Sequence, residues 1–209
     1  MNMPAIRTES DTKPPLGRAD WLRAALETFI THGVDAVQIT KIAKQIGMTR
    51  GSFYWHFQSR DDLLSAMLKE WQAANSEFFN QALANCETLD QGVLSFFKIW
   101  VGDDRFNPNL DQAIRDWARL DDKVLDLVRE EDNRRIMDIA NMYARFDFEK
   151  GDAEVRARVL YFTQVGYTSI NLGEAMSERL ALLEPYYLAH TGRVLDKKIA
   201  EGFRSELNQ

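Results

Sequence analysis

A run of seven residues near the end of the first quarter of the chain concentrates side chains that donate hydrogen bonds or stack on flat rings. Its members are Arg50, Gly51, Ser52, Phe53, Tyr54, Trp55 and His56. A guanidinium can donate two hydrogen bonds to one guanine in the major groove, and hydroxyl and imidazole groups can bond to phosphate oxygens. The run therefore favours contact with duplex nucleic acid, in which Gly51 lets the backbone approach closely.

The residues before this run have the pattern needed to position it. Apolar side chains recur at helical spacing and stop at Gly47, the residue type best able to end a helix in a left-handed turn; they are Ile39, Ile42, Ala43 and Ile46. Thr49 can cap a second, short helix over about residues 50–56. On that helix only Phe53 and Phe57, with Met48 before it, look buried. Two short helices joined by a glycine turn predict a helix-turn-helix whose second helix faces DNA.

At these residues the chain resembles the tetracycline-repressor (TetR) family of bacterial transcription regulators. The resemblance covers roughly residues 21–64 and consists of an amphipathic first helix, Gly33, Ile42–Ala43, Gly47, Tyr54–Trp55–His56–Phe57, Ser59, a basic residue and Leu63–Leu64. It implies an all-α fold, with an N-terminal three-helix helix-turn-helix domain and a C-terminal helical bundle for ligand binding and dimerisation. We therefore predict a disordered arm at 1–17, a DNA-binding domain at 18–64 and an effector-binding and dimerisation domain at 65–209.

The predicted DNA contacts are Thr40, Lys41, Thr49, Arg50, Gly51, Ser52, Tyr54, Trp55, His56 and Arg60. By resemblance, Tyr54 and His56 bond to phosphates and Trp55 packs on a sugar or a thymine methyl group. The chain departs from the family at Gln38, where Ser or Thr is common, and Thr40 or Lys41 could take over part of that contact. Alternatives stay open: His56 and the two aromatics could be buried, Arg50 could simply be exposed, and Thr49 could serve only as a cap.

The formal net charge of −6 at first argues against a nucleic-acid partner. Residues 18–70 nevertheless carry a net charge of +1, and Lys41, Lys44, Arg50 and Arg60 flank the predicted turn. Local charge sets the attraction to phosphate, so the acidic total does not exclude DNA. A solvated surface is the alternative explanation for these basic residues.

The remaining periodicity is helical, and no segment has the period of a strand. The first helix should span residues 18–32, and the fourth should run from a Ser59 cap to about residue 84, reaching both halves of the protein. Further helices are expected at about 88–101, at about 110–118 after Pro108, from about residue 125 to about 148, at 152–173 with Asp152 as cap, after Ser177, and at 193–207. Pro185 should kink or split the helix that contains it.

Two features of the C-terminal part suggest partners. The helices at 152–173 and after Ser177 carry more apolar residues than one core face needs, which with the resemblance predicts a homodimer; an entirely intramolecular core is the alternative. Aromatic residues also suggest an effector pocket, with Trp100, Trp117, Tyr143, Tyr161 and Tyr167 as the predicted ligand contacts. Arg115, Arg119 and Asn171 are candidate polar partners, although Asp111 could pair with Arg115 on the surface, and any of these aromatics could be core.

The sequence contains no recognisable catalytic or metal-binding motif. The three histidines are far apart in sequence, Cys86 is the single cysteine, and there is no phosphate-binding loop or nucleophile elbow. We expect no enzyme activity, no cofactor, no membrane segment and a cytoplasmic location. The leading hypothesis is a regulator that binds a palindromic double-stranded DNA operator and acts as a repressor released by a small apolar or aromatic effector. The alternatives are a small-molecule binding protein with a vestigial helix-turn-helix, and a DNA-binding dimer without an effector.

Overall fold

The computed structural model describes the backbone of residues 17–102 and 106–207, and their side chains except those of 74–82 and 100–102. The described chain is built of helices without a strand. The elements are α1 (Arg18–His32), η1 (Val34–Ala36), α2 (Ile39–Gln45), α3 (Arg50–Phe53), α4 (Arg60–Ala84), α5 (Leu89–Gly102), α6 (Pro108–Ala118), α7 (Asp122–Arg145), α8 (Lys150–Ile170), α9 (Met176–Ala181), α10 (Leu183–Thr191) and α11 (Lys197–Leu207). The predicted all-α fold is confirmed, and most of the predicted arm lies outside the described residues.

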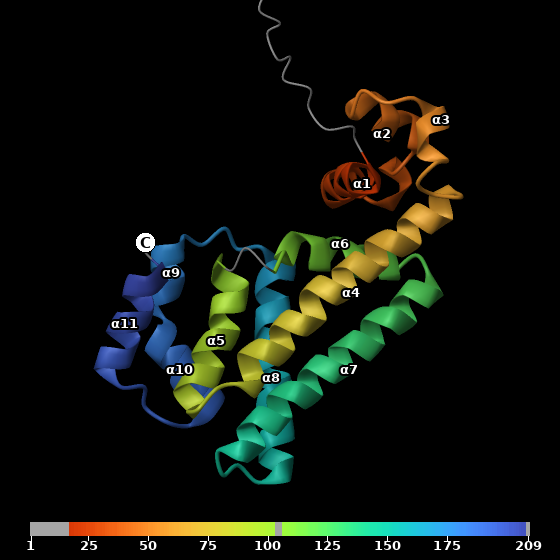
Figure 1. Ribbon diagram of the computed structural model, residues 1–209. Helices are drawn as coiled ribbons and strands as arrows, with labels where there is room; N and C mark the ends of the chain where they lie inside the picture. Colours follow the sequence, from red (N-terminus) through yellow and green to blue (C-terminus); the bar gives the residue numbers. More distant parts are fainter. Residues whose placement is uncertain (1–16, 103–105, 208–209) are drawn as a thin grey trace, which may run out of the picture.

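The long helix α4 joins two groups of helices (Figure 1). Its first turn lies beside α1–α3, and the rest runs alongside α7 towards α5 and α8. Ser59 caps it by accepting a hydrogen bond from the amide of Asp62 at 3.1 Å, as its sequence predicts. The predicted extent of this helix, to about residue 84, agrees with the structure.

A first hydrophobic core lies where α1, α2, α3 and the start of α4 meet. Trp21, Phe29, Ile42, Phe53 and Phe57 are at most 2% exposed in it. The same core takes in apolar residues of α6 and of the start of α7, namely Leu110, Ile114, Trp117, Ala118, Val124 and Val128. This packing places α6 against the half of the protein that contains α1–α3, which the periodicity of a single helix could not predict. The boundary at residues 64/65 lies inside α4 and stays a prediction.

The second hydrophobic core is formed by α5, the C-terminal half of α7, and α8 to α11. Helices α7 and α8 pack along each other, and α9, α10 and α11 cover the far side of α5 (Figure 1). None of the helices in the described part of the chain combines the length and the apolar composition needed to cross a membrane.

The predicted ends of several C-terminal helices were wrong by a few residues. Helix α8 begins at Lys150, so Asp152 lies in its first turn and Glu149 is the cap; it ends at a left-handed Asn171 rather than at Gly173. The helix predicted to kink or split at Pro185 is two helices: α9 ends at Ala181, and α10 begins at Leu183 with Pro185 in its first turn. The last helix begins at Lys197 rather than at residue 193, after an Asp196 side chain that accepts a hydrogen bond from the amide of Lys198.

A candidate nucleic-acid interface

The turn between α2 and α3 has the predicted geometry. Gly47 has φ = 69°, a left-handed conformation that side chains with a Cβ rarely adopt. The amide of Met48 reaches back to the carbonyl of Ala43 at 2.8 Å, and the Thr49 hydroxyl accepts a hydrogen bond from the amide of Ser52 at 3.2 Å. Thr49 is thus a helix cap, and the hydrogen bonds that close the turn span fewer than ten residues, while Phe53 anchors α3 against Trp21 of α1.

Helix α3 is shorter than predicted. Regular helix ends at Phe53, and residues 54–56 form tighter turns in which the amide of Trp55 bonds to the carbonyl of Ser52 and that of His56 to the carbonyl of Phe53. Bonds to the residue three positions back wind the chain more tightly than an α-helix does. The ring of Phe57 stacks on that of Phe53, with centroids 5.4 Å apart, so two aromatic anchors hold the end of the segment in the core.

Arg50, Tyr54 and Trp55 lie at the surface, whereas Phe53 and Phe57 lie in the core. Trp55 is 87% exposed and Tyr54 is 50% exposed, whereas Phe53 is fully buried. The alternative in which Trp55 is a core aromatic is therefore wrong. Arg50 is exposed, and one of its amino groups lies 3.3 Å from the Tyr54 hydroxyl. His56 is half-buried, which lies between the two alternatives, an exposed phosphate contact and a buried histidine.

Other predicted contacts surround this exposed group. Thr40 and Lys41 are exposed in the first turn of α2, and Gln38 at its cap position makes no capping bond. Arg60 is half-buried: its Nε donates to the carbonyl of Val37 at 2.7 Å, and an amino group donates to the carbonyl of Val34 at 2.6 Å. Arg60 therefore fixes the start of α4 to the segment before α2, and its role as a DNA contact stays a prediction.

The predicted ligand residues do not meet in one place. Tyr143 and Tyr161 are at most 1% exposed in the second core, Trp117 packs edge-on against Phe29 at 5.8 Å, and the side chain of Trp100 lies outside the described part. Tyr167 is half-buried and lines a hollow between α5, α8 and α10. The ligand roles of all five stay predictions.

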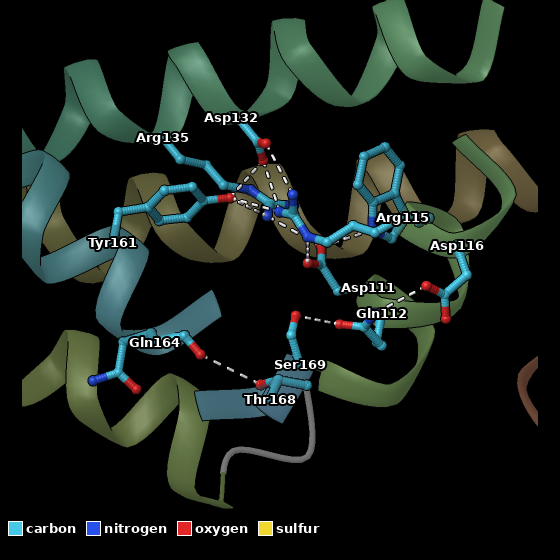
Figure 2. A network of polar contacts seen from close by, with 11 residues as sticks. Asp111, Gln112, Arg115, Asp116, Asp132, Arg135, Tyr161, Gln164, Thr168 and Ser169 are labelled. Atoms are coloured by element: carbon cyan, nitrogen blue, oxygen red, sulfur yellow. Dashed lines mark hydrogen bonds and ion pairs between the residues drawn. The ribbon is translucent and has the colours of Figure 1, made fainter. Parts of the chain in front are cut away.

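Tyr161 instead belongs to a buried polar network beneath α6 (Figure 2). Arg115 donates to Asp111 at 2.9 Å and forms a two-pronged pair with Asp132 at 2.7 and 2.9 Å. Arg135 donates to Asp111 at 3.1 Å, and the Tyr161 hydroxyl donates to Asp132 at 2.7 Å. The indole of Trp71 on α4 completes the network by donating to Asp111 at 3.0 Å, so four helices, α4, α6, α7 and α8, are linked.

The two carboxylates and two guanidiniums of this network balance in charge. Burial opposes the ionisation of Asp111, but Arg135 and Arg115 outweigh it, so the pKa of Asp111 lies below its ordinary value. The pKa of Arg135 is raised: burial opposes its charge, and Asp111 more than compensates. The predicted pairing of Asp111 with Arg115 is found, but it is buried rather than on the surface, because their helix lies under α7 and α8.

Sequence reasoning missed most of this network and two further buried polar residues. Asp132 and Arg135 lie in a charged stretch of α7 that looks solvated in sequence, and Gln164 and His190 interrupt apolar faces of α8 and α10. A polar residue at a core position of a helical period was the available signal. Among the residues described, no cluster of His, Cys, Asp and Glu could hold a metal ion.

Comparison with known proteins identifies the N-terminal segment. Residues 22–67 match the family described as bacterial regulatory proteins, tetR family. The chain is 43% identical over 68 residues to the uncharacterized HTH-type transcriptional regulator TtgW of Pseudomonas putida, covering 32% of this chain and 49% of that protein. It is 40% identical over 55 residues to the HTH-type transcriptional regulator AcrR of Shigella flexneri, covering 26% of this chain and 24% of that one.

The chain thus aligns with less than half of the length of either relative. The fold as a whole is similar to solved structures. A TetR-family transcriptional regulator from Marinobacter aquaeolei VT8 superposes with a TM-score of 0.63 at 15% identity, covering 91% of this chain and 97% of that one. Residues 22–67 thus carry the helix-turn-helix domain described for the tetR family of bacterial regulatory proteins, and the similarity to the two regulators lies in the N-terminal part of the chain.

Proposed function

We propose that the protein is a sequence-specific DNA-binding transcriptional regulator. The observation that carries the proposal is the exposed group on α3 and the turn after it, Arg50, Tyr54 and Trp55, held by buried Phe53 and Phe57. An indole that is 87% exposed gains nothing for folding, whereas an aromatic and a guanidinium on a rigid turn suit base edges, sugars and phosphates. In this proposal, Arg50 reads a base and Tyr54 and His56 position the helix on the backbone.

The proposed regulator acts as a homodimer on a palindromic operator. Helix α8 carries an exposed apolar stripe of Val155, Val159 and Phe162, which are 59%, 47% and 54% exposed. The stripe continues to Gly166, where an added Cβ would meet nothing within 4 Å, and α10 adds Leu188 at 47% exposure. Apolar residues repeating along one helix face are a suitable surface for a two-fold symmetric contact.

The proposed outcome of DNA binding is repression that a small apolar or aromatic effector relieves. In a dimer, the two recognition segments must lie about 34 Å apart to enter successive major grooves. A ligand that binds better to another spacing shifts the population away from the DNA-binding form. The buried network gives such a shift a route, because it joins α8 and α7 to α6, which packs on α1 through Trp117 and Phe29.

The DNA-binding test uses the full chain and duplexes selected from a random library. Arg50→Ala should weaken binding to the selected duplex by about 1–3 kcal/mol per contact and relax the preference at one base position. Arg129→Ala, which removes an exposed arginine of α7, is the matched control and should leave affinity unchanged. If no duplex is selected, the DNA-binding proposal fails, and if Arg50→Ala binds the selected duplex like the wild type, the base contact proposed for Arg50 fails.

The dimer test is sedimentation of the protein without DNA. Phe162→Glu places a charge on the α8 stripe and should convert dimers to monomers at micromolar concentration. Leu120→Glu changes an apolar residue that is 78% exposed outside the stripe, and it should leave the dimer intact. A wild type that sediments as a monomer would contradict this part alone.

A further inference from the structure

The segment that leads into α2 contains a buried carbonyl whose hydrogen-bond donor comes from another helix. Val37, the residue before the cap position of α2, is fully buried. Its carbonyl accepts a hydrogen bond from Nε of Arg60 at 2.7 Å, and no other donor to that carbonyl is found in the described part of the chain. Because a buried carbonyl without a donor is costly, Arg60 meets a requirement of this segment.

The carbonyls of η1 are paired as well. An amino group of Arg60 donates to the carbonyl of Val34 at 2.6 Å. The side-chain amide of Gln38 donates to the carbonyl of Asp35 at 3.1 Å, and its backbone amide donates to that of Ala36 at 2.8 Å. Gln38 thus holds the turn before α2 and makes no capping bond to α2 itself. Two side chains therefore fix this turn, and one of them belongs to α4.

The first turn of α4 gives Arg60 a fixed base. Arg60 is the first residue of the helix, and the Ser59 hydroxyl before it accepts a hydrogen bond from the amide of Asp62 at 3.1 Å. The carboxylate of Asp62 in turn accepts a hydrogen bond from the amide of Gln58 at 2.9 Å. These bonds hold the backbone on both sides of Arg60. The guanidinium therefore extends from a backbone that is already ordered by local contacts.

Arg60 provides a direct link between two helices that otherwise pack on different neighbours. Helix α2 packs mainly on α1 and α3, whereas α4 packs mainly on α7, α5 and α1. The two bonds of Arg60 join α4 to residues that are 23 and 26 positions earlier in sequence. The direction in which the chain enters α2 is therefore set relative to α4 by this side chain.

The same bonds argue against a phosphate contact by Arg60. Its side chain is half-buried, whereas Lys41 and Lys44 of α2 are exposed. If the guanidinium turned towards a phosphate, the carbonyl of Val37 would be left buried without its donor. The exposed lysines can meet phosphates without such a loss. Arg60 is therefore better placed to order the backbone than to contact DNA.

We propose that Arg60 is a positioning residue for DNA recognition. It sets the orientation of α2 and, through the turn at Gly47, that of α3, and it acts through the backbone rather than through a phosphate. As a statement about DNA binding, this inference rests on the proposed function. As a statement about the order of the segment before α2, it rests on the two bonds to Val34 and Val37.

The first test measures hydrogen exchange of the full-length protein without DNA, by mass spectrometry of peptides that cover residues 34–45. In Arg60→Met, these amides should exchange at least about tenfold faster than in the wild type, because hydrogen bonds from a charged group are lost. Peptides from α8 should be unaffected. Arg129→Met, which removes an exposed arginine of α7, is the matched control and should leave both regions unchanged. Unchanged exchange of residues 34–45 in Arg60→Met would overturn the inference.

The second test measures the affinity of the same variants for the selected duplex as the salt concentration is varied. Arg60→Met should bind at least about tenfold more weakly than the wild type, because α2 and α3 are less well ordered. The slope of log affinity against log salt concentration should stay the same, since no phosphate contact is lost. Loss of a phosphate contact would instead reduce that slope by about 1, and this result would overturn the inference.

Arg60→Lys separates the two roles even if Arg60→Met folds poorly, which thermal melting detects. Lysine keeps the charge and would preserve a phosphate contact, but its single ammonium group lacks the fork that bonds to both carbonyls. The lysine variant should therefore restore neither the affinity nor the slow exchange. A lysine variant that binds like the wild type would assign Arg60 to a phosphate. Faster exchange in Arg60→Met, with no duplex bound by the wild type, would overturn the proposed function and uphold the link between α4 and α2.

Discussion

Arg50 and Arg135 carry the same guanidinium group in opposite surroundings. Arg50 is exposed at the start of α3, with the Tyr54 hydroxyl at 3.3 Å. Arg135 is 1% exposed and bonds to Asp111 and Tyr161, which come from two other helices. The hydrogen bonds of the turn after α2 are local, Phe53 anchors α3 on Trp21, and the exposed polar groups are available for a partner, whereas the polar groups of the ion-pair network bond mainly to one another. Substitutions should therefore separate binding from stability.

The largest effect is expected where one charge of the network is removed. Arg135→Met leaves Asp111 buried with fewer partners and should lower the free energy of unfolding by about 3–5 kcal/mol. For a chain of this length, the melting temperature should fall by roughly 6–20 °C. Thermal melting followed by circular dichroism measures the change.

Two controls sharpen this result. Arg119→Ala removes a guanidinium that is 76% exposed and should change stability by less than about 0.5 kcal/mol. The double variant Asp111→Leu/Arg135→Met removes both charges and should recover much of the loss, because neither partner is left unpaired. A single variant as stable as the wild type would contradict the role of the network.

A smaller loss of stability is expected from protonation of His190. Its folded-state pKa of about 4 lies below that of an unfolded histidine, near 6.5, so the unfolded chain binds the extra proton first as pH falls. Stability from this residue is complete above about pH 6.5, declines between pH 6.5 and 4, and amounts to about 3 kcal/mol. Denaturant titrations of the wild type and of His190→Gln across this range measure it.

The variant should lose the part of the pH dependence that His190 causes, while the exposed His32 offers a matched comparison. Replacing His32 by Gln should leave the wild-type pH dependence in place. A steep wild-type decline that persists in His190→Gln would assign the acid sensitivity to other groups, such as the carboxylates of the ion-pair network.

Loss of the Thr49 cap should be milder. Thr49→Ala removes the acceptor for the amide of Ser52 and should reduce stability by about 1 kcal/mol. The same change at Thr40, an exposed residue of α2 that does not cap a helix, should have less effect. Equal losses for the two variants in denaturant titrations would show that the cap contributes nothing specific.

The smallest effect on stability is expected at Trp55, together with a clear effect on binding. Trp55→Ala removes an indole that touches little of the protein, so stability should change by no more than about 0.5 kcal/mol while operator affinity falls. Its neighbour Phe53 is fully buried, and Phe53→Ala should cost about 3–5 kcal/mol. Fluorescence anisotropy with a labelled duplex, beside thermal melting, separates the two outcomes.

The difference between the two regions also explains how much could be predicted. Gly47, Thr49, Phe53 and Phe57 specify the turn through neighbours in sequence, so its position and its exposed side chains were predictable. The C-terminal end of α3 could not be predicted from these residues. Residues 54–56 form tighter turns before Phe57, whose ring is buried against Phe53.

The ion-pair network and the hollow were beyond prediction for a different reason. Asp111, Asp132 and Tyr161 meet only after three helices pack, and a helical period in one segment does not say which face of another segment it meets. For the same reason, Tyr143 and Tyr161 looked like pocket candidates, although the structure places both in the core.

The position of α6 has a consequence for any attempt to divide the protein. The hydrophobic core against which α1 packs includes Trp117, which is more than forty residues beyond the helix-turn-helix in sequence. A peptide that ends at residue 64 would expose Phe29 to water. We expect it to melt at a lower temperature, to aggregate, or to hold α2 and α3 in an altered orientation. The segment proposed to contact DNA and the segment that could be excised intact are therefore different parts of this chain.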